Sequence, residues 1–149
     1  DVLTVSIHGH PSYAYPYFSG FADETGQGTG LGFNRNFPLP ENTGPEAYLE
    51  TFEKAHRFIE RFKPDFVVVS LGLDTLRGDV TGAFTLNPTA LKTMGQRLAE
   101  LSRPLLVVQE GGYSLRNLKR GAASFFNGVA AGLTPATGQN PRPSKGKRS

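Results

Sequence analysis

Asp65-Phe-Val-Val-Val-Ser-Leu-Gly-Leu-Asp74 is an almost continuous apolar run that ends in glycine, leucine and aspartate. Such a run is typical of a β-strand that is buried on both faces of a parallel sheet. A lone carboxylate at the end of a buried strand is costly unless it is paired or binds a metal. Asp74 is therefore a candidate functional residue. The alternative is that Asp74 or Asp79 caps the loop that follows.

Further helices and strands are predicted before and after this run in the sequence. An amphipathic helix is predicted over 45–62, where Pro64 prevents its continuation, and it places His56 on the solvent side. A second helix begins at Pro88 with Asn87 as its N-cap, and a third follows Tyr113. Apolar, β-branched runs predict further strands over 2–7, 33–39 and 104–109. The order predicts an α/β fold with a mostly parallel sheet and helices on both faces.

Three polar segments follow strands of this predicted sheet. They are His8-Gly-His10, Gly72-Leu-Asp74 and Glu110-Gly-Gly-Tyr113. Because parallel strands end at the same edge, we expect these segments to share one rim, where α/β proteins bind ligands.

Composition limits the function classes. The 149 residues fit one domain, and the absence of cysteine excludes disulfide scaffolds and cysteine metal sites. No run is long enough for a membrane span, so we expect a cytoplasmic protein. Residues 134–149 carry four basic residues and no acid, which leaves a net charge of −1 on 1–133. This tail is predicted to be disordered; a weak nucleic-acid arm is the alternative.

Two further motifs are ambiguous. His8 and His10 are two residues apart, so on a strand both imidazoles would face one side and bind one metal ion, with Asp74 supplying an oxygen. The alternative is that one histidine is packed and the other exposed. The glycine-rich segment 26–32 resembles a phosphate loop, but it precedes a strand instead of opening a helix, which favours a turn.

Five segments of the chain resemble motifs of the zinc-dependent histone deacetylase superfamily, and they follow one another in the same order as in that superfamily. Two carry its paired signatures, and three resemble its acetylpolyamine amidohydrolase branch. The paired signatures are Ser70-Leu-Gly-Leu-Asp-Thr-Leu-Arg-Gly-Asp79 and Glu110-Gly-Gly-Tyr113; the others are Ile7-His-Gly-His-Pro11, Tyr15-Pro-Tyr-Phe-Ser-Gly20 and Phe21-Ala-Asp-Glu-Thr-Gly26.

This resemblance implies the arginase–deacetylase fold and zinc-dependent hydrolysis of an N-acetyl amide, with an acetylated amine as the substrate. It makes Asp74 a zinc ligand and Tyr113 the donor to the acetyl carbonyl. His8 matches a position that is not a zinc ligand. The remaining assignments are Phe18, Gly111 and Gly112 at the substrate, and the Ser6 hydroxyl and Ile7 carbonyl at a structural potassium ion.

One family motif has no counterpart in the chain. The other two zinc ligands of the family belong to an Asp-x-His motif on the preceding strand, and the chain contains no Asp-x-His. We therefore expect residues 1–133 to be the C-terminal part of a deacetylase-like catalytic domain, inactive alone and partnered by an N-terminal half. The alternative is a truncated, non-catalytic relative that acts as an interaction module. A homo-oligomer is compatible with either interpretation; nucleic acid and membrane are not expected partners.

Overall fold

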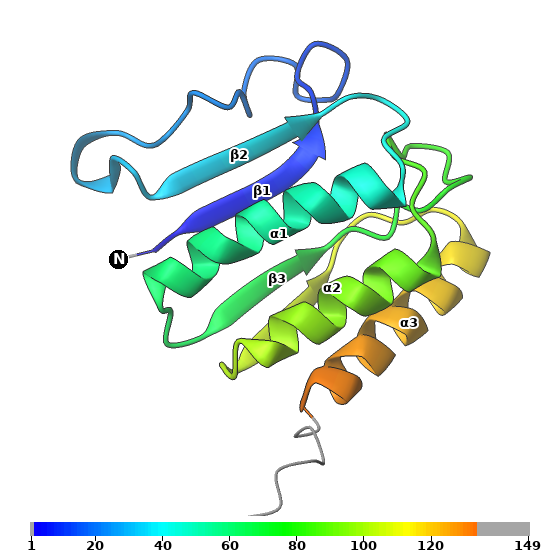
Figure 1. Cartoon of the computed structure of the whole chain (residues 1–149). Coiled ribbons are helices and arrows are strands. Elements are labelled where there is room, and N and C mark those ends of the chain that lie inside the picture. The colour runs from blue at the N-terminus through cyan, green and yellow to red at the C-terminus, as the bar shows by residue number, and fades with distance from the viewer. Residues whose placement is uncertain (1, 134–149) are drawn as a thin grey trace, which may run out of the picture.

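A computed structural model describes residues 2–133 (Figure 1). The predicted basic tail, 134–149, lies outside the described residues. Strands and helices alternate after an initial strand–loop–strand unit. The elements are β1 (Thr4–Gly9), the short 3-10 helix η1 (Gly28–Gly30), β2 (Asn34–Leu39), α1 (Pro45–Phe62), β3 (Val67–Leu71), α2 (Pro88–Glu100), β4 (Leu105–Gln109) and α3 (Leu115–Leu133).

The four strands form two parallel pairs. β1 pairs with β2, beginning with Thr4 opposite Asn34, and β3 pairs with β4, beginning with Val67 opposite Leu105. All the strands point toward the same end of the molecule (Figure 1). The predicted parallel direction is therefore confirmed. No ladder joins β1 to β3, so the described strands form two sheets of two strands each.

α1 begins and ends where the sequence predicts, and α2 begins at the predicted residue. α1 starts at Pro45, and after Phe62 the chain turns through Lys63, which has a left-handed φ of 55°. At the start of α2 the Asn87 side chain accepts a hydrogen bond from the Ala90 amide at 2.9 Å, which confirms the N-cap. No helix among residues 2–133 is long and apolar enough to span a membrane.

The core lies between the helices and one face of the β3–β4 pair. The other face of this pair is bare: Val68, Leu106 and Val108 are exposed on alternate positions. The prediction that β3 is buried on both faces is therefore wrong for the described chain, because the helices cover only one face of the strand. The largest buried members of the core are Phe52, Leu73, Leu76, Leu86, Leu91 and Phe125.

α2 and α3 meet along a seam of glycines. A Cβ on Gly128 would overlap the carbonyl of Lys92, and one on Gly95 would overlap the carbonyl of Phe125. Gly132 faces the Gln96 carbonyl in the same way. The two helix backbones therefore touch directly, and any side chain at these positions forces the helices apart.

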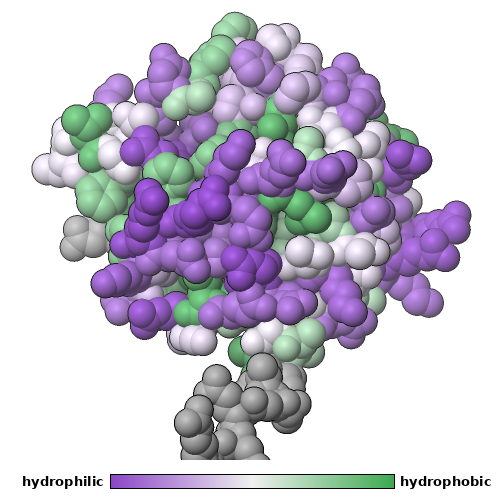
Figure 2. Space-filling view, viewed as in Figure 1, coloured by the Kyte–Doolittle hydropathy of each residue, from purple (hydrophilic) through white to green (hydrophobic). Residues whose placement is uncertain are grey.

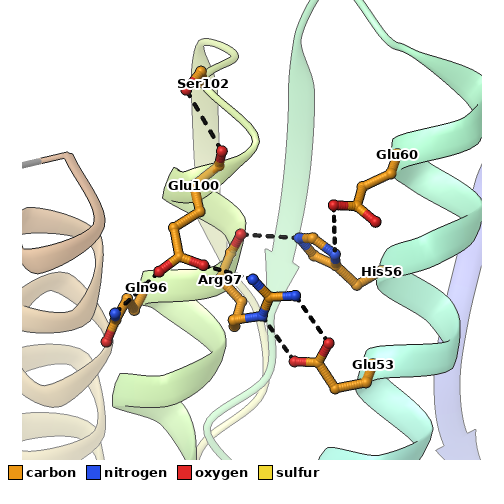
Figure 3. A network of polar contacts seen from close by, with 7 residues as sticks. All are labelled: Glu53, His56, Glu60, Gln96, Arg97, Glu100 and Ser102. Carbon is orange, nitrogen blue, oxygen red and sulfur yellow. Dashed lines mark hydrogen bonds and ion pairs between the residues drawn. The ribbon is translucent and has the colours of Figure 1, made fainter. Parts of the chain in front are cut away.

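α1 and α2 are joined by a polar network (Figure 3). Arg97 donates to both carboxylate oxygens of Glu53, at 2.9 and 3.0 Å, and to Glu100 at 2.6 Å. The hydrogen bond from Arg97 holds the pKa of Glu53 below its ordinary value. His56 is 1% exposed, and its Nε2 donates to the Arg97 carbonyl at 2.9 Å. The expected solvent position of His56 is wrong, because this face of α1 packs on α2.

The β1–β2 connection, residues 10–33, keeps most of its aromatic rings at the surface. Phe18 is 89% exposed and Tyr15 is 86% exposed. Tyr13 ties the connection down, since its hydroxyl donates to the Leu39 carbonyl at 2.8 Å. The segment Gly28–Gly30 is a 3-10 turn that leads into β2, so it does not open a helix as a phosphate loop would. In the space-filling view of Figure 2, the surface over α1 and α2 is mostly hydrophilic.

Candidate functional site

The loops after β3 and β4 lie together at one end of the molecule (Figure 1). The backbone ladder continues beyond the strands: Glu110 donates to Leu71 at 3.0 Å, and Leu73 donates to Gly111 at 2.7 Å. Two of the predicted rim segments, 72–74 and 110–113, are thus hydrogen-bonded side by side.

Asp74 occupies a recess made by glycines of both loops. A Cβ on Gly72 would lie 2.8 Å from Oδ1 of Asp74, and one on Gly111 would overlap the carboxylate. Gly82 packs against the Asp74 carbonyl. Desolvation by burial raises the pKa of Asp74, and hydrogen bonds from its own amide and from Thr75 oppose this only in part. A partly desolvated carboxylate with small neighbours is suited to binding a cation.

Asp79 anchors the loop that carries Tyr113. Its Oδ2 accepts hydrogen bonds from the backbone amides of Tyr113 at 2.8 Å and Ser114 at 3.0 Å. Its Oδ1 accepts from the amide of Thr81 at 3.2 Å. Burial raises the pKa of Asp79, but these amide donors outweigh burial and the net pKa lies below the ordinary value. Asp79 therefore stays ionised and fixes the start of α3.

Tyr113 and Phe18 lie at the surface. Tyr113 is 64% exposed directly after Gly112, whose φ of 144° suits glycine. Phe18 comes from the separate β1–β2 connection. The structure thus brings Asp74, Gly111 and the Tyr113 backbone together, and it places Phe18 on another element.

Of the two interpretations of His8 and His10, the structure does not support the metal pair. His8 uses both ring nitrogens, Nδ1 with the Ser6 hydroxyl at 2.7 Å and Nε2 with the Gly20 carbonyl at 2.8 Å. His10 lies just beyond the end of β1, where Nδ1 contacts the Ser12 hydroxyl at 2.8 Å and the ring packs edge-on against Phe21 at 5.9 Å between centroids.

A cavity of about 640 Å³ connects β1 with Asp74. Ser6 and Ile7 line it from β1, and Asp74 lines it beyond the end of β3. Between residues 2 and 133, no group of three His, Cys, Asp or Glu side chains is placed to hold a metal. Asp74 is a single carboxylate at this cavity, while a catalytic zinc takes three protein ligands. The described residues do not form a complete zinc site.

The contact of Asp79 with Tyr113 and the packing of Gly82 against Asp74 were not predicted from the sequence, although the capping of the local loop by Asp79 was one of the alternatives. A short carboxylate between Gly78 and Gly82 indicates a residue that accepts local backbone amides, which is the capping alternative stated above. Its principal partner, Tyr113, is thirty-four residues later. No local pattern gives that contact.

Comparison with known proteins decides the family. Residues 1–129 match the histone deacetylase domain. The chain belongs to the histone deacetylase family. It is 42% identical over 131 residues to the acetylpolyamine amidohydrolase of Burkholderia pseudomallei, covering 88% of this chain and 38% of that protein. It is 35% identical over 138 residues to histone deacetylase 15 of Arabidopsis thaliana, covering 91% of this chain and 25% of that protein.

Superposition on solved structures identifies the fold of this chain. A crystal structure of acetylpolyamine aminohydrolase from Burkholderia pseudomallei superposes with a TM-score of 0.86 at 42% identity, covering 89% of this chain and 39% of that one. The crystal structure of the HDA15 HD domain superposes with a TM-score of 0.82 at 33% identity, covering 94% of this chain and 40% of that one. The predicted arginase–deacetylase fold is therefore confirmed. This histone deacetylase family chain spans about two fifths of the length of the acetylpolyamine amidohydrolase that it matches.

Proposed function

We propose that this chain is the C-terminal part of a zinc-dependent hydrolase that removes acetyl groups from N-acetyl amides of the acetylpolyamine or acetyl-lysine type. The observation that carries the proposal is the joined pair of rim loops. They hold a partly desolvated carboxylate, Asp74, beside a glycine turn that presents Tyr113, in a chain of the histone deacetylase family.

In this proposal each residue has a distinct task. Asp74 is one zinc ligand, and polypeptide outside the described residues supplies the others. When bound, zinc activates water and polarises the acetyl oxygen. The Tyr113 hydroxyl donates a hydrogen bond to the same oxygen as negative charge develops on it. Gly111 and Gly112 are the proposed substrate-binding residues of the turn, and the missing side chain of Gly111 lets the Asp74 carboxylate lie against it.

The other assigned residues support the site from β1 and its connection. The Ser6 hydroxyl and the Ile7 carbonyl are proposed ligands of a structural potassium ion, and both residues line the cavity that reaches Asp74. Phe18 is a proposed wall of the substrate channel; an exposed aromatic ring attracts aliphatic and ammonium groups.

Two substitutions in the complete catalytic protein test the proposal. Asp74→Asn should lose zinc, measured by elemental analysis. Tyr113→Phe should keep zinc but lose about 10²–10³ in acetate release from an N-acetylated diamine or an acetyl-lysine peptide. Phe126→Leu, on an exposed position of α3, is the control. Unchanged zinc in the first variant, or full turnover in the second, would remove the assignment.

A second candidate function is a non-catalytic interaction module. It is favoured by the bare face of β3–β4, where Val68, Leu106 and Val108 are exposed. If the 149-residue chain has this function, it should associate with itself or with a partner. A stable monomer in sedimentation, with a cooperative unfolding transition, would contradict it.

A further inference from the structure

The aromatic ring of Phe18 is not held in place by packing. Its side chain is 89% exposed, so the position of the ring depends on the backbone on either side of it. Before Phe18, the amide of Tyr17 donates to the Ala14 carbonyl at 2.9 Å. After Phe18, the chain is held again at Gly20. Only Phe18 and Ser19 lie between these two fixed points.

Gly20 is held at both polar groups of its backbone. Its amide donates to Oε2 of Glu24 at 2.8 Å, and its carbonyl accepts a hydrogen bond from Nε2 of His8 at 2.8 Å. Its φ of 101° favours glycine, and a Cβ here would lie 2.6 Å from Nε2 of His8. The approach of the imidazole therefore depends on the missing side chain. We call His8, Gly20 and Glu24 the Gly20 clamp.

The histidine of the clamp is fixed by β1. Because a carbonyl oxygen only accepts, Nε2 of His8 is the donor to Gly20. In the neutral ring Nδ1 then accepts from the hydroxyl of Ser6, also on β1, at 2.7 Å. Both ring nitrogens are thus engaged, and the orientation of the imidazole is set by two partners.

The glutamate of the clamp is fixed by β2. Nδ2 of Asn34 donates to the Glu24 carbonyl at 2.5 Å. Nδ2 of Asn36 donates to the Phe21 carbonyl at 3.1 Å and lies 3.5 Å from Oε2 of Glu24. The clamp therefore ties the turn that carries Phe18 to both strands of the β1–β2 pair.

A cavity of about 400 Å³ lies beside the clamp. Tyr15, Pro16 and Ser19 of the turn line it, and so do Asn34 and Asn36 of β2. The turn therefore does not rest on close-packed side chains there. Hydrogen bonds at Gly20 supply the fixation that packing supplies in a core.

We propose that His8 and Glu24 are positioning residues for the Phe18 wall of the substrate channel. They act through the backbone of Gly20 and fix the turn that presents the ring to the substrate. This inference rests on the proposed function, because it takes Phe18 as part of the channel. Loss of either side chain should weaken binding of the acetylated amine and leave the hydrolysis of bound substrate intact.

The main test compares Glu24→Ala with Glu24→Gln in the complete catalytic protein. Alanine removes the acceptor of the Gly20 amide, whereas glutamine keeps a carbonyl oxygen in its place. Acetate release is measured with the N-acetylated diamine or the acetyl-lysine peptide, whichever the wild type hydrolyses. Glu24→Ala should raise KM about threefold to tenfold, the range of an exposed cation–π contact. Its kcat should hold within about twofold, and Glu24→Gln should restore KM.

Two further variants complete the comparison. Asp23→Ala removes the neighbouring, exposed carboxylate and is the control, so it should leave KM unchanged. His8→Ala removes the other side chain of the clamp and should raise KM as Glu24→Ala does. Amide hydrogen exchange at Gly20 in the 149-residue chain should quicken about tenfold in Glu24→Ala and stay unchanged in Asp23→Ala.

A double-mutant cycle shows whether Glu24 acts through the aromatic ring. In a Phe18→Ala background, Glu24→Ala should add nothing to KM, because the wall that it positions is already absent. A rise in KM that persists in this background would overturn the proposal. Equal effects of Glu24→Ala and Asp23→Ala on KM, or unchanged exchange at Gly20 in Glu24→Ala, would overturn it as well.

The outcomes also separate this inference from the proposed function. If Phe18→Ala leaves KM unchanged, the proposed channel wall fails and the positioning role fails with it. If Phe18→Ala raises KM and Glu24→Ala does not, the wall stands and the positioning role alone is refuted.

Discussion

The β3–α2–β4–α3 half of the molecule and the β1–connection–β2 part are built in different ways. In the first, helix backbones touch through glycines, and Phe125 is only 1% exposed. In the second, a long connection is held by individual hydrogen bonds such as that from Tyr13 to Leu39, and Phe18 is 89% exposed. The close-packed half holds Asp74 and Tyr113, while the looser part carries the proposed substrate wall.

This difference matches the proposed roles of the two regions, the reaction in the first and substrate contact in the second. Groups that act on the reacting bond need fixed positions, and packing supplies them. A surface that only contacts the substrate, as proposed for Phe18, does not need positions as fixed as those of the reacting groups. Substitutions in the two regions should therefore differ in what they change: stability in the first, substrate choice in the second.

Among the changes to backbone contacts, the largest effect is expected at the glycine seam. Gly128→Ala places a Cβ against the Lys92 carbonyl, so α3 must move or the chain must strain. We expect a loss of about 3 kcal/mol in the free energy of unfolding, measured by denaturant titration. Gly30→Ala, with nothing within 4 Å of its added Cβ, is the control and should change little. Equal effects of the two would contradict the packing contrast.

A smaller loss is expected at the loop anchor. Asp79→Ala leaves the amides of Tyr113 and Ser114 without their acceptor, which should cost about 1–2 kcal/mol of stability. Asp79→Asn keeps an acceptor oxygen and should cost less. Amide exchange at Tyr113 and Ser114 should quicken in the alanine variant. If it stays unchanged, Asp79 does not hold this loop.

The network between α1 and α2 predicts a modest pH dependence. Because the folded pKa of Glu53 lies below its unfolded value, its contribution is complete above the unfolded pKa and is lost as pH falls through the folded pKa. Glu53→Gln should therefore be less stable than the wild type at pH 7, by less than about 1 kcal/mol. The difference should shrink in acid. Glu50→Gln, an exposed change on α1, is the control, and a gap that widens in acid would contradict this sign.

The smallest change in stability is expected at Phe18. Because the ring is 89% exposed, Phe18→Ala should alter the free energy of unfolding by less than about 0.5 kcal/mol. The matched aromatic change Phe125→Ala should cost about 3–5 kcal/mol. In the complete catalytic protein Phe18→Ala should raise KM for acetylated amines. A Phe18 variant that unfolds as readily as the Phe125 variant would refute the contrast.

The elements could be predicted because their signals are local. The apolar run 65–71, the proline and capping residues of α2 and the spacing of apolar residues in α1 all fix short segments. The position of Asp74 at the end of a parallel strand follows from the same pattern. The resemblance also named Tyr113, and its loop does lie beside that of Asp74.

The remaining features depend on contacts distant in sequence. His56 is buried because α2 covers that face of α1, and no residue near it indicates this. The metal-pair interpretation of His8 and His10 fails because the partners of His8 include Gly20, twelve residues away. The bare face of β3–β4 depends on what packs there, which an apolar pattern within one strand does not specify.

The glycine seam also has a consequence for recombination between relatives. Gly95 on α2 and Gly128 and Gly132 on α3 abut backbone atoms of the opposite helix, so the two surfaces are complementary without intervening side chains. A chimaera that takes α3 from one homologue and α2 from another would join surfaces shaped for different partners. Crossover points between homologues should therefore lie before Asn87 or after Leu133, so that the two helices are inherited together.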